Sequence, residues 1–167
     1  MTLAEDEMNL LLVRAVMVDA GRLLLAHDEG ASHVYLPGGK VEKGESLRDA
    51  LKRELREELG IAPAIGDYLG FVEYEWGFAP KTILEINHCF QVNANATSAL
   101  ESKEACLDFR WIPLPVLGDA DLRPPVLGAL ITALVSGDRS VWSVPKEEAN
   151  KAPEPTPGSV TLRASSR

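Results

Sequence analysis

The sequence GKVEKGESLRDALKRELREELGI occupies residues 39–61 and holds the strongest pattern in the chain. Its residues after Ser46 favour a helix, because Glu, Leu, Lys and Arg are good helix formers. Ser46 can cap the first turn with Asp49 at the third helical position, and Gly60 is placed to end the helix. At about 100° per residue, three apolar side chains form a stripe along this helix: Leu47, Ala50 and Leu51.

One turn further on, three glutamates continue the stripe. Relative to Leu47, Glu54 lies at about 340°, Glu57 at about 280° and Glu58 at about 20°. Unpaired carboxylates are very costly to bury, and a hard cation with oxygen ligands compensates them. A glutamate-rich surface helix is the alternative, but the placement of the acids favours a site for metal and phosphate.

The same stretch resembles the Nudix box, G-x5-E-x7-R-E-U-x-E-E-x-G-U, in which U is a bulky aliphatic residue. Every specified position is filled, by Gly39, Glu45, Arg53, Glu54, Leu55, Glu57, Glu58, Gly60 and Ile61. The resemblance to the Nudix hydrolase family also covers the LPGG lead-in, Leu36 to Gly39. It implies an α/β fold, a Nudix-like α/β/α sandwich with a mixed β-sheet between helices.

The resemblance implies roles for the charged residues of the box. Three acids would bind Mg²⁺, for which Mn²⁺ could substitute: Glu54, Glu57 and Glu58. A backbone carbonyl of Gly38 or Gly39 would be a further metal ligand. Glu45 and Arg53 would pair and hold the loop against the helix, and with Glu54 they are the catalytic candidates of the box. From their charges alone, Glu45 and Arg53 could equally form an ordinary surface ion pair that contributes little.

A base must still accept a proton from the attacking water. In the family that this box resembles, the base or an additional metal ligand often lies outside the box, upstream of a tryptophan in a strand. Glu104, upstream of Trp111, is therefore the first candidate for the base. Glu85, in the predicted strand Thr82 to Val92, is the second. Either acid could instead be a bystander.

Length and composition favour a single enzyme domain over residues 1–144, followed by a flexible tail over residues 145–167 that is rich in Pro, Lys, Glu and Ser. The net charge of −8 makes nucleic acid an improbable partner. A nucleotide is still acceptable, because a metal supplies local positive charge. The acidic N-terminus does not resemble a secretory signal, and no apolar run approaches the roughly 20 residues that span a bilayer. We therefore expect a cytoplasmic enzyme.

Apolar stretches bounded by turn residues predict five main strands: Asn9 to Asp19, Leu23 to Ala26, Tyr68 to Trp76, Thr82 to Val92 and Phe109 to Ile112. A short helix is predicted to begin within Pro113 to Leu117, and a full helix covers Pro125 to Val135. Strands with separated helices are typical of an α/β sandwich with helices on both sides of a mixed sheet.

The group attached to the diphosphate would be chosen outside the box. Tyr74, Trp76 and Phe78 alternate and would share one face of a strand, where aromatic rings could stack on a base. The alternative is core packing, which we favour slightly for Tyr74 and Trp76. Phe78 lies in the predicted loop and is therefore the best stacking candidate. Lys40 and Tyr35 could contact phosphate or base, or be plain loop and strand-end residues.

These features together predict a Mg²⁺-dependent pyrophosphohydrolase that cleaves a nucleoside diphosphate linked to another moiety. The leading substrate class is a nucleoside triphosphate or its oxidised form, followed by nucleotide sugars, ADP-ribose and dinucleoside polyphosphates. The alternative is a non-catalytic nucleotide-sensing domain that regulates a partner, and a weaker rival is a hydrolase of capped RNA ends. Members of the family that this chain resembles frequently pair as dimers, so a homodimer is one expectation and the oligomeric state stays open.

Overall fold

The computed structural model describes residues 7–78, 81–93 and 100–138. The first of its two sheets has the strand order β5–β1–β7–β6. Its strands are β1 (Glu7–Val16), β5 (Gly38–Lys40), β6 (Ile65–Phe78) and β7 (Lys81–Val92). β1 runs parallel to β7 and antiparallel to β5, whereas β6 is antiparallel to β7. The predicted mixed sheet is therefore present.

The second sheet has the order β2–β3–β4–β9, and β8 pairs with β3. Its strands are β2 (Val18–Asp19), β3 (Arg22–Asp28), β4 (Val34–Tyr35), β8 (Leu107–Pro113) and β9 (Leu122–Arg123). β4 and β9 run parallel, with Tyr35 paired to Arg123. The strands therefore form two sheets, where a single mixed sheet was expected.

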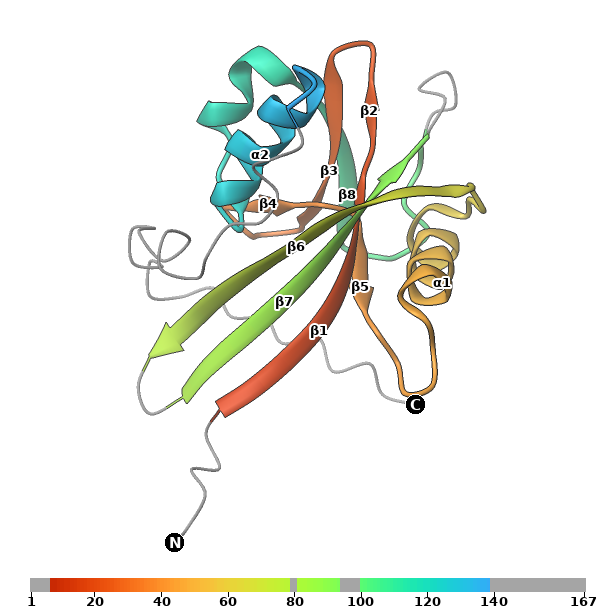
Figure 1. Ribbon diagram of the computed structural model, residues 1–167, viewed down its shortest axis with the longest axis vertical. Coiled ribbons are helices and arrows are strands. Elements are labelled where there is room, and N and C mark those ends of the chain that lie inside the picture. The colour runs from red at the N-terminus through yellow and green to blue at the C-terminus, as the bar shows by residue number, and fades with distance from the viewer. Residues whose placement is uncertain (1–6, 79–80, 94–99, 139–167) are drawn as a thin grey trace, which may run out of the picture.

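Helices cover the strands from two sides, as Figure 1 shows. Helix α1 (Leu47–Leu59) packs with Val13, Ala15 and Met17 in one apolar cluster. Helix α2 (Val126–Val135) and the 3-10 helix η1 (Leu114–Asp119) contribute to a second cluster, which contains Val16. Side chains alternate across a strand, so β1 supplies both cores. This arrangement confirms the predicted α/β sandwich.

One predicted strand is wrong in its extent. Asn9 to Asp19 was expected to be continuous, but β1 ends at Val16 and β2 begins at Val18. Up to Val16 the chain pairs with β7 in the first sheet, and from Val18 it pairs with β3 in the second. Met17, whose carbonyl accepts the N–H of Leu24 at 3.0 Å, is the crossing point between the sheets.

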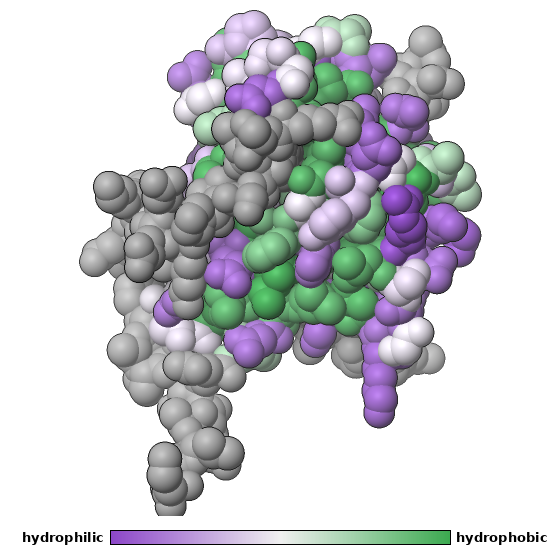
Figure 2. All heavy atoms as spheres, in the orientation of Figure 1, coloured by the Kyte–Doolittle hydropathy of each residue, from purple (hydrophilic) through white to green (hydrophobic). Residues whose placement is uncertain are grey.

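The surface of the molecule is uneven in polarity. Figure 2 shows apolar side chains gathered over the strands of the first sheet and polar side chains gathered over α1. Large exposed apolar residues of this sheet include Leu11, Tyr68 and Phe71. Within the described part of the chain, the helices are too short or too polar to cross a bilayer. The predicted tail, residues 145–167, lies outside the described residues.

Candidate active site

Helix α1 has both predicted caps. The Ser46 hydroxyl accepts the N–H of Asp49 at 3.1 Å, and Gly60 closes the helix with a left-handed φ of 67°. The N–H of Gly60 donates to the carbonyl of Arg56 at 2.9 Å. The buried side chains of Leu51 and Leu55 fix the helix against the first sheet. These contacts set the position of every acid on the helix.

Arg53 lies at the centre of a network of charges. Its Nε and Nη2 donate to the two carboxylate oxygens of Glu45 at 2.8 and 2.9 Å. Its Nη1 donates to Glu54 at 2.8 Å and to Glu57 at 3.2 Å. Nη2 also donates to the carbonyl of Lys40 at 2.9 Å. The predicted pairing of Arg53 with Glu45 is therefore present, and Arg53 joins the loop to the helix.

This network changes the proton affinity of the paired groups. The hydrogen bond from Arg53, aided by the backbone of Glu42, lowers the pKa of Glu45 to about 2. The bonds to Glu45 and Glu54 raise the pKa of Arg53, against the effect of burial. A bidentate arginine–carboxylate pair is more directional than a single ion pair. The loop after Gly39 is thus held in one place.

Glu58 is the most buried acid of the site, with 6% of its surface exposed. One carboxylate oxygen accepts the backbone N–H of Gly38 at 3.1 Å. Burial raises the pKa of Glu58 to about 8, and the charges of Glu54 and Glu104 act in the same direction. The Gly38 N–H and Arg14 oppose this shift. A carboxylate held here is short of compensating positive charge.

Glu54 lies directly against the backbone of Gly39. A Cβ placed on Gly39 would come within 2.6 Å of the Glu54 carboxylate, so a larger residue here would displace the end of the Glu54 side chain. Burial raises the pKa of Glu54 despite its bond to Arg53. The sequence placed Glu54 and Glu58 on the inward stripe, and both are found there.

Glu57 departs from that prediction. Its side chain is 52% exposed and contacts Arg53 rather than the sheet. At about 280° it stood at the margin of the stripe, where a small rotation of the helix turns a side chain toward solvent. Glu57 therefore lies beside the two buried acids and outside the buried stripe.

Arg14 belongs to this site and was not singled out from the sequence. Its Nη1 donates to the carbonyl oxygens of Leu36 at 3.2 Å and Gly38 at 3.1 Å. Its guanidinium carbon also lies 5.3 Å from the centroid of the Tyr35 ring. The available signal was a single charged residue inside the apolar run Leu10 to Val16. The Gly38 carbonyl is one of the two backbone groups that were predicted as alternative metal ligands, and in this structure it accepts a hydrogen bond from Arg14.

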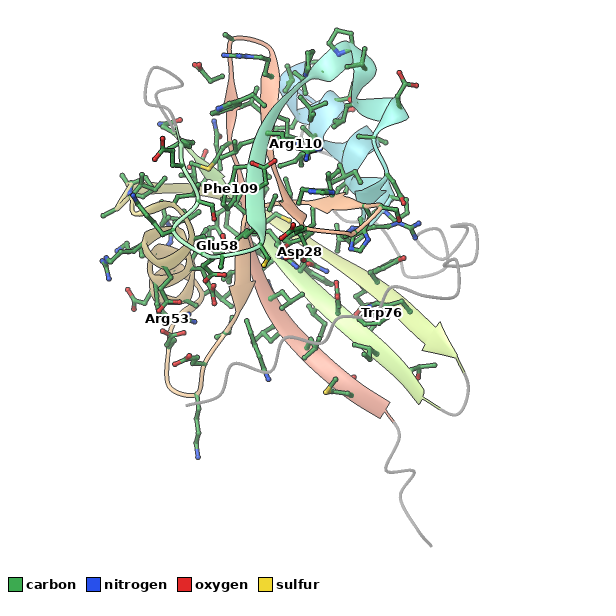
Figure 3. The ribbon with its side chains drawn as sticks, turned by 180° about the vertical axis from the view of Figure 1, so that it is seen from behind. Asp28, Arg53, Glu58, Trp76, Phe109 and Arg110 are labelled. Carbon is green, nitrogen blue, oxygen red and sulfur yellow. The ribbon has the colours of Figure 1, made fainter. Side chains whose placement is uncertain are left out.

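The two candidate bases lie in different surroundings. Glu104 is exposed, and its charge raises the pKa of both Glu54 and Glu58. The neighbouring N–H of Lys103 donates to the carbonyl of Glu58 at 2.7 Å, which docks this loop on α1. Glu85 on β7 instead accepts hydrogen bonds from Trp76 and Asn87. In Figure 3, Glu58 extends from α1 and Trp76 lies apart from it on β6.

The three substrate-binding candidates, Lys40, Tyr35 and Phe78, lie on three different strands. Lys40 has an exposed side chain beside the loop that Arg53 holds. Tyr35 is half-buried and donates its hydroxyl to Asp28 at 3.0 Å. Burial and the charge of Asp28 raise the pKa of Tyr35. Phe78 ends β6, and its side chain lies outside the described part of the structure.

The donor set of the site suits a hard divalent cation. Among the described residues, no three His, Cys, Asp or Glu side chains are grouped to hold a metal ion, and Arg53 occupies oxygens of Glu54 and Glu57. Glu54 and Glu58 nevertheless offer oxygen atoms from two carboxylates whose pKa values are raised by burial. A cation with carboxylate ligands would remove this electrostatic cost. The residues present therefore fit a hard divalent cation.

Fold and box together define a class of protein. The family model described as the NUDIX domain matches residues 8–131, and the chain belongs to this family. It is 46% identical over 61 residues to the CTP pyrophosphohydrolase of Escherichia coli (strain K12), covering 34% of this chain and 45% of the relative. It is 32% identical over 87 residues to the oxidized purine nucleoside triphosphate hydrolase of Mus musculus, covering 52% and 53%.

The chain thus spans about half the length of these curated relatives. Among solved structures, it resembles the MutT protein from Methanosarcina mazei Go1 with a TM-score of 0.60 and 25% identity. That likeness covers 78% of this chain and 96% of the other. The structural match extends well beyond the box.

Proposed function

We propose that this chain is a Mg²⁺-dependent pyrophosphohydrolase that cleaves a nucleoside diphosphate linked to another moiety. The observation that carries the proposal is the placement of two carboxylates against the double glycine. Glu58 accepts the N–H of Gly38, and Glu54 lies against Gly39 in space that a Cβ would fill. Carboxylates so placed would repel a diphosphate unless a cation lay between them.

We assign the metal ligands to Glu54 and Glu58, with Glu57 at the exposed margin and Gly38 or Gly39 as the backbone donor. When bound, Mg²⁺ would offset the charge of the phosphate oxygens and lower the pKa of the attacking water. Arg53 orients Glu54 and Glu57 through its Nη1, while its Nε and Nη2 hold the loop at Glu45 and Lys40 against α1. Phosphoryl transfer depends mainly on such positioning and electrostatics.

Glu104 is the proposed base. It is exposed, close enough to act on the charges of Glu54 and Glu58, and carried by a loop that is docked on α1. A base must lie within hydrogen-bond reach of the water that it deprotonates, and Glu104 is the exposed carboxylate whose charge acts on both ligand acids. Glu104 would take the proton as the water attacks phosphorus and the anhydride bond breaks.

The substrate class that we favour is a nucleoside triphosphate or its oxidised form. The names of the two curated relatives, a CTP pyrophosphohydrolase and an oxidized purine nucleoside triphosphate hydrolase, support this choice. Nucleotide sugars, ADP-ribose and dinucleoside polyphosphates carry the same diphosphate and belong in the same test. That two copies pair and that the protein acts in the cytoplasm stay predictions; light scattering of the purified protein tests the first.

The test is release of pyrophosphate, phosphate or nucleotide from this substrate panel, with Mg²⁺ and with excess chelator. The proposal predicts turnover of at least one class with Mg²⁺, and its loss with chelator. Turnover that survives complete chelation would contradict the role of the metal. Nucleotide binding without turnover of any class would indicate the sensing domain.

A further inference from the structure

A row of polar side chains crosses the first sheet on the face that Val16, Val72 and Cys89 turn toward the α2 core. Arg14 donates its Nε to the Asn87 side-chain oxygen at 3.0 Å. The row then continues from Asn87 on β7 to Glu85, two residues away on the same face. Charged and amide groups are unexpected beside the apolar core that Val16, Val72 and Cys89 join on this face.

The row ends at Trp76 on β6. Its indole Nε1 donates to Glu85 Oε1 at 3.0 Å, while the Asn87 amide nitrogen donates to Glu85 Oε2 at 3.3 Å. Two donors from different strands therefore hold the Glu85 carboxylate, one on each oxygen. Trp76 is held by the same bond and remains partly exposed.

The other end of the row reaches the candidate active site. Arg14 donates to the Gly38 carbonyl, and the Gly38 N–H donates to Glu58. The row thus runs from the carboxylates of α1 to a partly exposed acid and an indole ring. This row is a polar path along which a nucleotide with its phosphates at Glu58 could extend its base.

The far end of the row is open to a ligand. Asn87 is fully buried, with its oxygen engaged by Arg14 and its nitrogen by Glu85. Glu85 is partly exposed, and each carboxylate oxygen has a second lone pair beyond its one protein donor. A carboxylate accepts hydrogen bonds and cannot donate them, so it selects groups that carry N–H or O–H donors.

We infer that Glu85 and Trp76 recognise the nucleobase, and that Glu85 selects a base edge with two adjacent N–H donors. Guanine and its oxidised forms present such an edge at N1 and the 2-amino group. Adenine and cytosine place a ring acceptor beside their one amino group and fit a carboxylate less well. The indole of Trp76 would stack on the base. This inference rests on the proposed function and gives Glu85 a role in specificity instead of proton transfer.

The test compares dGTP with dITP, which keeps N1–H and lacks the 2-amino group. Sites that hydrogen-bond a substrate group discriminate strongly against the analogue without it. We expect kcat/KM for dGTP to exceed that for dITP by about tenfold, the lower range of a bidentate base contact. Glu85→Gln should lower kcat/KM for dGTP more than for dITP and bring the ratio of the two to about one. Thermal melting would check that this variant folds.

Two further variants sharpen the comparison. Glu73→Gln removes an acid from the same sheet, paired in register with Ile86 on the opposite face, and should keep the wild-type ratio. Trp76→Phe keeps a ring and removes the donor to Glu85, and should weaken the preference for dGTP. An unchanged ratio in Glu85→Gln would overturn the inference. So would an equal loss of kcat on both substrates, which would make Glu85 the base.

Binding separates this inference from the proposed function. The monophosphates dGMP and dIMP contain no anhydride bond, so their Kd values, measured by tryptophan fluorescence, need no turnover. Tighter binding of dGMP, lost in Glu85→Gln, would support base recognition even if no triphosphate were hydrolysed. Equal Kd values for both in the wild type would overturn the inference, even if hydrolysis of other substrates confirmed the proposed function.

Discussion

The backbone N–H of Gly38 donates to a carboxylate oxygen of Glu58 across 3.1 Å, although the two residues are 20 positions apart. The bond joins the short strand β5 to the last turn of α1 in a buried place. A Cβ on Gly38 would collide with the Val13 carbonyl of β1, so glycine is required for this approach. The site is therefore built by close contact between sheet and helix.

Arg53→Lys tests the network that orients the acids. Lysine has a single nitrogen and cannot replace a guanidinium that contacts Glu45, Glu54 and Glu57 together. We expect kcat to fall by about 100-fold, as for other small misplacements of catalytic groups. Arg56→Lys, an exposed change on the same helix, should leave kcat unchanged. Equal activity of the two variants would show that Arg53 does not orient the catalytic acids.

Gly39→Ala tests the contact between the backbone and Glu54. The added methyl group would displace the Glu54 carboxylate, which lies 2.6 Å from the new Cβ. We expect loss of most activity with little change in the free energy of unfolding, because the displaced atoms are the far end of a flexible side chain. Gly128→Ala in α2 meets no atom within 4 Å and should stabilise the helix by about 0.5–1 kcal/mol. Chemical denaturation of both variants measures the difference.

Glu104→Gln tests the base. Removing a general base lowers rates by about 10²–10⁴-fold, and substrate binding should change little because no ligand acid is altered. Steady-state kinetics would show this as a fall in kcat at nearly constant KM. Glu101→Gln, on the same exposed loop, is the matched control. A normal kcat in Glu104→Gln would place the base elsewhere.

The two cysteines should differ in reactivity. Burial raises the pKa of Cys89 to about 12, whereas Cys106 is exposed. Thiolate is the reactive form, and a group with a raised pKa stays protonated until the pH approaches that value. At pH 8 one thiol of the native protein should react with a colorimetric thiol reagent, and two should react after unfolding. Rapid reaction of both native thiols would show that the Cys89 environment is open.

Much of the site could be predicted from local periodicity. The positions of Glu54 and Glu58 follow from the pitch of one helix, and the caps at Ser46 and Gly60 follow from short-range chemistry. Glu57 was misplaced because an idealised helix does not say how far its stripe extends. Within one element, sequence was an adequate guide.

Contacts between strands could not be predicted in this way. Arg14 reaches Gly38 only because β1 and β5 pair with Arg14 opposite Gly38, and Trp76 reaches Glu85 only in the observed register of β6 and β7. Strand register depends on turns and packing across the whole sheet. For the same reason the crossing at Met17, where the chain changes sheets, was not visible in a continuous apolar run.

The most direct test of the account is hydrolysis of nucleoside triphosphates by Glu58→Gln, with Mg²⁺ and beside the wild type. Glutamine keeps the size of the side chain and an oxygen for the Gly38 N–H, so melting temperature should not fall. The account predicts Mg²⁺-dependent hydrolysis by the wild type and a loss of at least about 100-fold in the folded variant. Wild-type rates in Glu58→Gln would contradict a metal site at Glu58.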